Sequence, residues 1–110
     1  METFVKGDVV VLPFPFSDLS SVKRRPALAV SVFEGHDLLL CQITSQFQPD
    51  NYSFRLNDSD FKAGNLNLPS FIRGNKLFTA DISLIQYKIG SIKDKKLKDV
   101  VESICGIIKN

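Results

Sequence analysis

The chain has 110 residues, of which 44% are hydrophobic, and it carries 14 Lys and Arg against 12 Asp and Glu. This length predicts a single domain spanning residues 1–110 with one modest core, and the composition excludes a disordered chain. The net charge of +2 is too small to indicate a nucleic-acid partner by itself, so any basic site must be local. The N-terminus lacks an apolar signal-peptide region, and no apolar run approaches membrane-spanning length, so we expect a cytoplasmic protein without membrane association.

The first half of the chain predicts three strands. Gly7–Leu12 is a β-branched run between Gly and Pro, which is typical of a buried strand. The stretch Phe14–Lys23 is rich in Pro, Ser and Asp and predicts a loop. Pro26–Phe33 and Leu38–Thr44 predict the next two strands, and the Gly-containing Glu34–Asp37 predicts a hairpin turn between them.

The second half predicts short strands followed by one helix. Asn57–Asn67 is polar and predicts a loop or a short helical turn. From Asp94 onward, apolar residues recur at spacings of three and four, which predicts an amphipathic helix with Asp94 at its cap or in its first turn. The lysines at its start are interpreted as a solvated helix end. The pattern favours a small, curled, mostly antiparallel sheet or barrel covered by the helix. The predicted strands are Tyr52–Leu56, Ser70–Arg73, Leu77–Ala80 and Ile82–Ile89, and the helix stripe is Leu97, Val100, Val101, Ile104 and Ile108.

The cysteines and the histidine are interpreted as structural. Cys41 ends an apolar run and Cys105 lies on the helix stripe, so we expect two buried free thiols and no disulfide. The lone histidine, His36, lies in the predicted hairpin turn and is assigned a turn role.

The hairpin suggests a register. If Gly35 and His36 form the centre of the turn, one face pairs only apolar residues, namely Leu28 with Ile43, Val30 with Cys41 and Val32 with Leu39. The other face is then small and polar, with Ala27 opposite Thr44 and Ala29 opposite Gln42.

This register gives Arg25 a defined neighbourhood. Arg25 lies on the small, polar face, opposite Gln46 and diagonal to Thr44, and diagonal neighbours are within reach of a long side chain. A guanidinium, a hydroxyl and an amide could share a patch to which the small Ala27 leaves access. Alternatively, Arg25 merely marks a strand edge and Thr44 is an ordinary β-forming residue.

Several short motifs follow one another along the chain. They are Gly7-Asp8-Val9-Val10, Pro13-Phe14-Pro15-Phe16, Lys23-Arg24-Arg25-Pro26-Ala27-Leu28, Ile43-Thr44-Ser45-Gln46, Pro69-Ser70 and Arg73 before Lys76-Leu77-Phe78. In this order they resemble the PemK/MazF family of toxins from bacterial type II toxin–antitoxin systems, and the resemblance covers nearly the whole chain.

The resemblance implies a fold, an activity and partners. The fold would be a small SH3-like β-barrel with a C-terminal helix (the MazF/CcdB/Kid-like toxin fold), present as a homodimer. The activity would be metal-independent, cofactor-free and sequence-selective cleavage of single-stranded mRNA through the substrate 2′-hydroxyl, neutralised by a cognate antitoxin. DNA binding would come only through the antitoxin complex. The catalytic residues would be Arg25, which binds phosphate through a planar fork, and Thr44.

Further residues are predicted to contact RNA: Lys23, Arg24, Ser45, Gln46, Ser70, Arg73, Lys76 and Phe16. For Lys23 and Arg24 the alternative is a solvated loop end, and for Ser45, Gln46 and Ser70 it is plain surface. Phe14 is assigned to the core, and the loop from Phe16 to Lys23 is expected to cover the RNA groove. Asn75 occupies a position where some relatives have an acidic residue, so no acid–base pair is evident and we expect modest turnover.

Two rival functions remain on the same fold. A non-enzymatic gyrase poison or binding module would rely on the tail Gly106–Asn110, which here resembles helix packing. A second rival is a toxin that binds RNA without cutting it, which the intact Arg25 and Thr44 disfavour and the missing acid or base favours.

Overall fold

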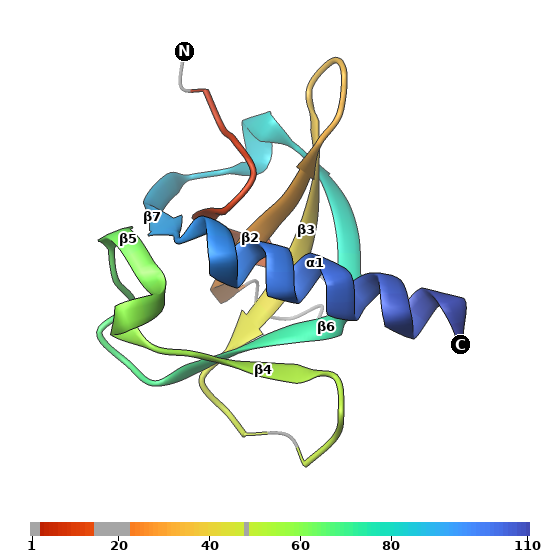
Figure 1. Cartoon of the computed structure of the whole chain (residues 1–110). Helices are drawn as coiled ribbons and strands as arrows, with labels where there is room; N and C mark the ends of the chain where they lie inside the picture. Colours follow the sequence, from red (N-terminus) through yellow and green to blue (C-terminus); the bar gives the residue numbers. More distant parts are fainter. Residues whose placement is uncertain (1–2, 15–22, 48) are drawn as a thin grey trace.

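The computed structural model describes residues 3–14, 23–47 and 49–110, which form one curled, seven-stranded antiparallel sheet and a C-terminal helix (Figure 1). The strand order is β4-β6-β3-β2-β1-β7-β5. This architecture confirms the predicted mainly-β fold with a terminal helix. The elements are β1 (Asp8–Phe14), β2 (Lys23–Val32), β3 (Asp37–Thr44), β4 (Ser53–Leu56), the 3₁₀ turn η1 (Asp58–Asp60), β5 (Phe61–Gly64), β6 (Ser70–Asp81), the 3₁₀ turn η2 (Ile82–Leu84), β7 (Tyr87–Ile92) and α1 (Asp94–Lys109).

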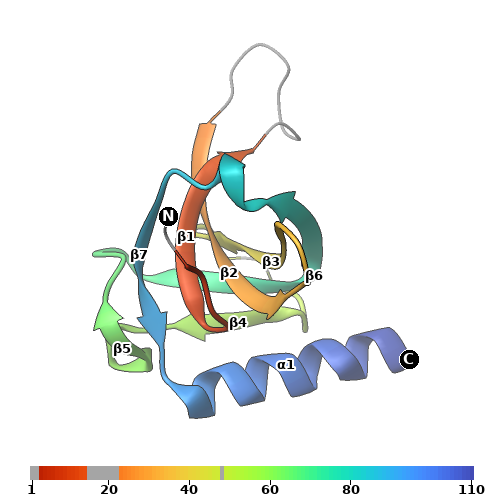
Figure 2. The ribbon, with the colours of Figure 1, turned by 90° about the horizontal axis from the view of Figure 1, so that it is seen from above.

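The central strands β1, β2 and β3 are buried on both faces. On one face, α1 covers a cluster that includes Val9, Leu28 and Ile43. On the other face lies a second cluster that includes Val10, Ala27 and Leu40, and the end of β6 and η2 pack against it (Figure 2). Two apolar faces explain why these strands read as nearly continuous hydrophobic runs rather than alternating ones.

The β2 strand begins three residues earlier than predicted. Pro13 pairs with Arg24 and Phe14 with Lys23, so both cations belong to the strand and not to the preceding loop. The weak β-preference of the basic residues is overridden by pairing with the buried end of β1, where Phe14 is 3% exposed. Phe14 is therefore a core residue, as predicted, and the predicted RNA contact Phe16 lies outside the described residues, as does most of the expected covering loop.

Three other boundaries differ from the prediction. Residues 70–81 form one long strand, β6, and not two short ones. Its Gly-containing middle stays within the strand because the pairing of β6 with β3 shifts register between Cys41 and Ile43. Ile82–Ile89 is not one strand but η2 followed by β7. The Asn57–Asn67 segment contains the expected helical turn, η1, together with the unpredicted strand β5, whose edge position needs no alternating pattern.

The predicted hairpin register is wrong by two residues over most of its length. Ala27 pairs with Gln42 and Leu28 with Cys41, and a bulge follows between Ala29 and Ser31. A register shift of two residues leaves each side chain on the same face of the sheet, and burial constrains the face and not the exact pairing. The face of Ala27 is nevertheless not open as expected, because Ala27 and Ala29 are fully buried in the second cluster.

The helix has the predicted span and buries Val100 and Ile104 against the sheet. Cys41 is fully buried, and its burial raises the pKa of the thiol to about 12, although the nearby Arg73 acts in the opposite direction. Cys105 is exposed, so the expectation that it is buried is wrong. The stripe defined by Leu97, Val100, Val101 and Ile104 already fills the contact with the sheet, which leaves Cys105 on its margin.

The carboxylate of Asp8 connects the start of β1 to β7. Asp8 is 1% exposed and accepts hydrogen bonds from the Val5 N–H, at 2.9 Å, and from the Ser91 hydroxyl, at 2.8 Å. Gly7 precedes it with a φ of 95°, a conformation that suits glycine. The Gly-Asp motif therefore has a structural role, since it fixes the strand that pairs with the basic end of β2.

Candidate functional site

A cavity of about 340 Å³ opens where the basic end of β2 meets the end of β3. β7 and the segment before β6 complete its walls. The described residues that line it include two arginines and no acidic residue, so the cavity favours an anionic ligand. The lining residues are Val11, Arg24, Arg25, Pro26, Ile43, Thr44, Ser45, Leu66, Leu68, Ser70, Tyr87 and Ile89.

The structure brings Arg25 and Thr44 together at this cavity, and both are half-buried. Continuing the observed pairing of Ala27 with Gln42 by two residues sets Arg25 directly opposite Thr44, not diagonal to it as the predicted register had it. The Thr44 hydroxyl accepts a hydrogen bond from the Gln46 N–H at 3.1 Å. A hydroxyl that accepts in this way keeps its own proton to donate to a ligand.

Three more of the predicted contacts line the same cavity. Arg24 and Ser45 are exposed there, and Ser70 is buried with its hydroxyl donating to the Leu68 carbonyl at 3.0 Å. Because side chains alternate along a strand, Arg24 and Arg25 leave β2 on opposite faces.

The other predicted contacts among residues 23–47 and 49–110 do not line this cavity. Gln46 is exposed just beyond Thr44, and Lys23 is exposed at the start of β2. Lys76 lines a separate cavity of about 270 Å³ with Phe14 and Phe78. Arg73 lies on β6, mostly buried and paired with a carboxylate.

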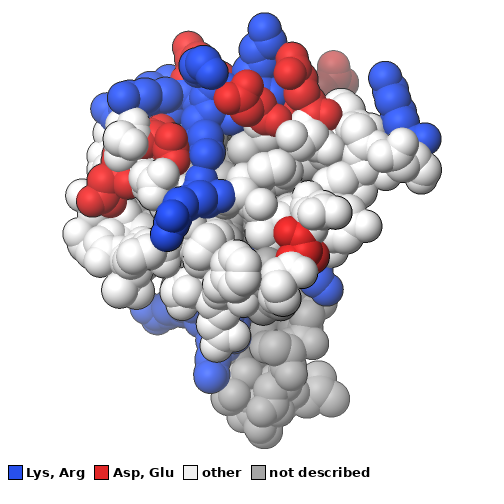
Figure 3. Space-filling view, turned by 60° about the horizontal axis from the view of Figure 1, so that its bottom comes forward, with Lys and Arg blue, Asp and Glu red and all other residues white. Residues whose placement is uncertain are grey.

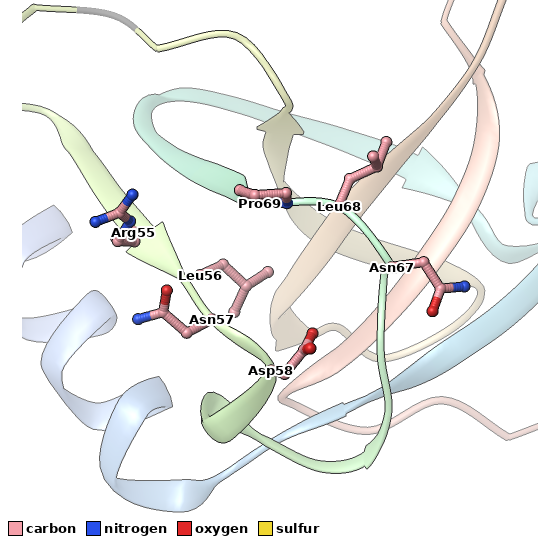
Figure 4. Close-up of a pocket in the computed structure, with 7 residues that line it drawn as sticks. All are labelled: Arg55, Leu56, Asn57, Asp58, Asn67, Leu68 and Pro69. Carbon is pink, nitrogen blue, oxygen red and sulfur yellow. The ribbon is translucent and has the colours of Figure 1, made fainter.

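Two further hollows lie next to this site. One, of about 300 Å³, is lined by Phe47, Asp50, Ser53, Arg55 and Phe71. The other, of about 220 Å³, lies between β4 with its following turn and the segment that leads into β6 (Figure 4). It shares Leu68 with the Arg25 cavity, and its polar groups include the Asp58 carboxylate and the Asn67 amide.

The charged residues are unevenly spread over the surface. Viewed from the β4 side, basic and acidic side chains intermingle along the upper edge, and a broad uncharged surface lies below them (Figure 3). Lysines near the start of α1 have acidic partners, namely Asp94 for Lys62, Asp60 for Lys96 and Asp99 for Lys95. This pairing agrees with a solvated helix end.

Within residues 3–14, 23–47 and 49–110, no three His, Cys, Asp or Glu side chains gather as a metal site would require. No helix in the described part of the chain has the length and apolar character needed to cross a membrane.

Sequence reasoning missed several residues of the site. Its walls also include Leu66 and Leu68, from the segment between β5 and β6, and Tyr87 and Ile89, from β7. This long-range arrangement is one that no local motif reveals. One signal was available in Phe47, an aromatic residue between two glutamines, which is 68% exposed. Asp50 gave no signal, because its partner Arg73 is 23 residues away in the sequence.

A family model described as PemK-like, MazF-like toxin of type II toxin–antitoxin system matches residues 5–108. The chain belongs to this family of toxins. The resemblance drawn from the ordered motifs is thereby confirmed. A search of curated proteins finds no match.

Solved structures share the fold of this PemK/MazF toxin. The Mycobacterium tuberculosis toxin MazF-mt6 superposes with a TM-score of 0.73 at 14% identity, covering 93% of this chain and 96% of that one. An endoribonuclease in complex with its cognate antitoxin, from a mycobacterial species, gives 0.72 at 14% identity with 94% and 96% covered. A MazE–MazF structure from Deinococcus radiodurans gives 0.72 at 16% identity with 94% of each chain covered. At these identities the likeness shows the MazF fold.

Proposed function

We propose that this toxin is a sequence-selective endoribonuclease that cleaves single-stranded mRNA without a metal or cofactor. The observation that carries the proposal is the meeting of Arg25 and Thr44 at one cavity whose described lining includes two arginines and no acidic residue. The family membership supports it, since PemK/MazF toxins are generally endoribonucleases. The same membership supports action in the cytoplasm, where mRNA is present.

The proposed reaction uses the RNA as the source of its own nucleophile. The 2′-hydroxyl next to the scissile phosphate gives its proton to water and attacks phosphorus, and the bond to the 5′-oxygen of the next nucleotide breaks. The leaving 5′-oxygen takes a proton from water, so the products are a 2′,3′-cyclic phosphate and a 5′-hydroxyl. Negative charge then develops on the phosphate oxygens. The Arg25 guanidinium can bind two of these oxygens at once, and donors aimed at developing charge typically contribute most to catalysis.

Thr44 assists from the neighbouring strand. Its hydroxyl already accepts from the Gln46 N–H, so its orientation is restricted and its proton can be directed at the phosphate or at the reacting 2′-oxygen. Arg24, Ser45 and Ser70 are proposed to hold the RNA backbone around this point, because they line the same cavity. Lys23, Gln46, Lys76 and Arg73 are proposed as more distant contacts.

A homodimer neutralised by a cognate antitoxin completes the proposal. Two of the structurally similar proteins were solved with antitoxins. This chain also exposes large apolar side chains that a protein partner could cover, among them Phe47 at 68% and Leu68 at 63%.

The test is cleavage of total RNA in EDTA by the purified wild-type protein and by Arg25→Ala and Arg25→Lys. We expect wild type to cut and Arg25→Ala to lose on the order of 10²-fold or more in rate, as when a preorganised donor is removed. Arg25→Lys keeps the charge without the fork and should also be impaired. Lys98→Ala, which removes an exposed charge from α1, is the control and should cut normally. Intact RNA with excess wild type, or normal cutting by Arg25→Ala, would overturn the proposal.

A further inference from the structure

Arg73 is held by an acidic residue in the RNA-free protein. Its Nη2 atom lies 3.1 Å from Oδ2 of Asp50, and the two side chains are only 13% and 29% exposed. The other oxygen of Asp50 accepts from the Tyr52 N–H at 2.9 Å and from the Ser53 hydroxyl at 3.3 Å. Asp50 is therefore positioned independently of Arg73, and it neutralises one of the predicted RNA-binding cations.

This ion pair borders a cavity next to the proposed catalytic residues. The β4–β6 register pairs Ser53 with Arg73 and Arg55 with Phe71, so all four side chains share one face. Phe71 in turn pairs with Thr44 on β3. Asp50 lines the cavity of about 300 Å³ on this face, together with Phe47 and Arg55, whereas Arg73 does not. The carboxylate thus separates Arg73 from a cavity that begins beside Thr44.

The guanidinium of Arg73 is only partly used. Its Nε atom is buried and has no hydrogen-bond partner among the described residues. Such buried, unsatisfied donors are rare and call for an explanation. A phosphate group, with more acceptor oxygens than this arrangement of Asp50 offers, can engage two N–H groups of an arginine side by side.

We propose that Asp50 is an internal competitor of the RNA: it occupies Arg73 in the free protein, and a phosphate of the bound strand displaces it. This inference rests on the proposed function, and it makes Asp50 a residue that sets RNA affinity. Arg55, at the rim of the same cavity, offers the incoming phosphate a first cation. Phe47 packs edge-on against Phe71 with ring centroids 5.6 Å apart, and its exposed face offers a stacking surface for the adjoining base.

The test compares Asp50→Asn with Asp94→Asn in binding a fluorescein-labelled, random-sequence, 2′-O-methyl single-stranded RNA, which lacks the reacting hydroxyl. Both substitutions raise the net charge by one. Asp94 is 94% exposed and pairs with Lys62, and neither residue lines the cavity beside Asp50, so Asp94→Asn controls for net charge alone. The asparagine introduced by Asp50→Asn retains an amide oxygen that can accept from Arg73, so the guanidinium is not left without a partner.

We expect Asp50→Asn to bind about fivefold more tightly than wild type, which corresponds to roughly 1 kcal/mol, the scale of a partly exposed ion pair. The slope of log affinity against log salt should stay near the wild-type value, because a phosphate contacts Arg73 in both complexes. Arg73→Gln in the Asp50→Asn background should remove the gain in affinity and make this slope shallower by about 0.7, the value for one phosphate contact with a single strand. If thermal melting shows that Asp50→Asn is unfolded, Asp50→Ser replaces it, because its hydroxyl can still accept from the Tyr52 N–H.

Equal or weaker binding by folded Asp50→Asn overturns the inference, and so does an equal gain in Asp94→Asn or a gain that survives Arg73→Gln. These results leave the proposed function intact as long as wild type binds the RNA. If neither wild type nor Asp50→Asn binds it, the proposed function fails as well, and the inference fails with it.

Discussion

Gly90→Ala should destabilise the protein and open a wall of the proposed site. Gly90 on β7 pairs with Gly64 on β5, and the backbones approach too closely there for a side chain. A Cβ added at Gly90 would overlap the Ala63 carbonyl oxygen, and it would lie 3.0 Å from the Gly64 Cα and 3.1 Å from the Ala63 carbonyl carbon. All three atoms belong to the backbone, so no side-chain rotation can relieve the overlap.

The size of the effect follows from this geometry. Ordinary carbon–oxygen contacts lie at about 3.3 Å or beyond, so the strands must separate by about 1 Å. Overpacking of this kind typically destabilises by about 1–3 kcal/mol, and each ladder hydrogen bond that is lost adds about 1 kcal/mol. We therefore expect the free energy of unfolding to fall by roughly 2–4 kcal/mol.

The matched control is Gly106→Ala, on α1. A Cβ there meets no atom within 4 Å outside its own helix, and alanine favours a helix over glycine by up to about 1 kcal/mol. The same chemical change should thus stabilise the protein at one position and destabilise it at the other.

Urea unfolding followed by far-UV circular dichroism measures both variants. Gly90→Ala should also lower RNA cleavage more than its folded fraction explains, because β5 leads directly into Leu66 and Leu68 of the Arg25 cavity. An unfolding free energy for Gly90→Ala within about 0.5 kcal/mol of wild type, the level of an innocuous surface substitution, would refute the tight β5–β7 approach.

Three further predictions concern single side chains. In a single-turnover assay, Thr44→Val should slow RNA cleavage by on the order of 10²-fold, whereas Thr44→Ser should cut at a rate near that of wild type. Equal cleavage rates for the two variants would show that the Thr44 hydroxyl has no role. Iodoacetamide at neutral pH should label only Cys105, because burial raises the pKa of the Cys41 thiol to about 12 and leaves almost no thiolate at neutral pH. Mass spectrometry of Cys105→Ser should then show no adduct, and a modified Cys41 would contradict this. Leu28→Ala, at a fully buried position, should lower the unfolding free energy by about 2–5 kcal/mol, measured by urea titration. A decrease in this free energy of under about 1 kcal/mol would be inconsistent with the packing around β2.

The elements whose pattern is local could be predicted from the sequence. The spacing of Leu97, Val100, Val101 and Ile104 gave the helix, and the β-branched run before Pro13 gave the first strand. The prediction that Leu28, Val30, Cys41 and Ile43 lie on one face of the β2–β3 hairpin was also correct, but the other face is buried and not open as expected. The register of this hairpin was wrong, because the bulge at Val30 inserts an unpaired residue, and a shift of two leaves the hydrophobic pattern unchanged.

Elements that depend on distant partners could not be predicted in the same way. β5 has no apolar periodicity and exists because it pairs with β7. The exposure of Cys105 follows from how α1 lies on the sheet, which the helical stripe alone does not determine. For the site, the Arg-Pro and Thr-Ser motifs located Arg25 and Thr44. The occupation of Arg73 by Asp50 depends on a contact between two strands and a loop that no motif records.

The most direct test of the account is to replace one 2′-hydroxyl in the substrate. Cleavage sites are first mapped by sequencing the products of wild-type digestion, and an oligonucleotide that spans one site is then made with 2′-deoxy sugar only at the nucleotide before the scissile phosphate. The account predicts that this RNA binds as well as its parent but is not cut, because it lacks the nucleophile that Arg25 and Thr44 are proposed to serve. Cleavage of the 2′-deoxy RNA at the rate of the parent would contradict the proposed mechanism.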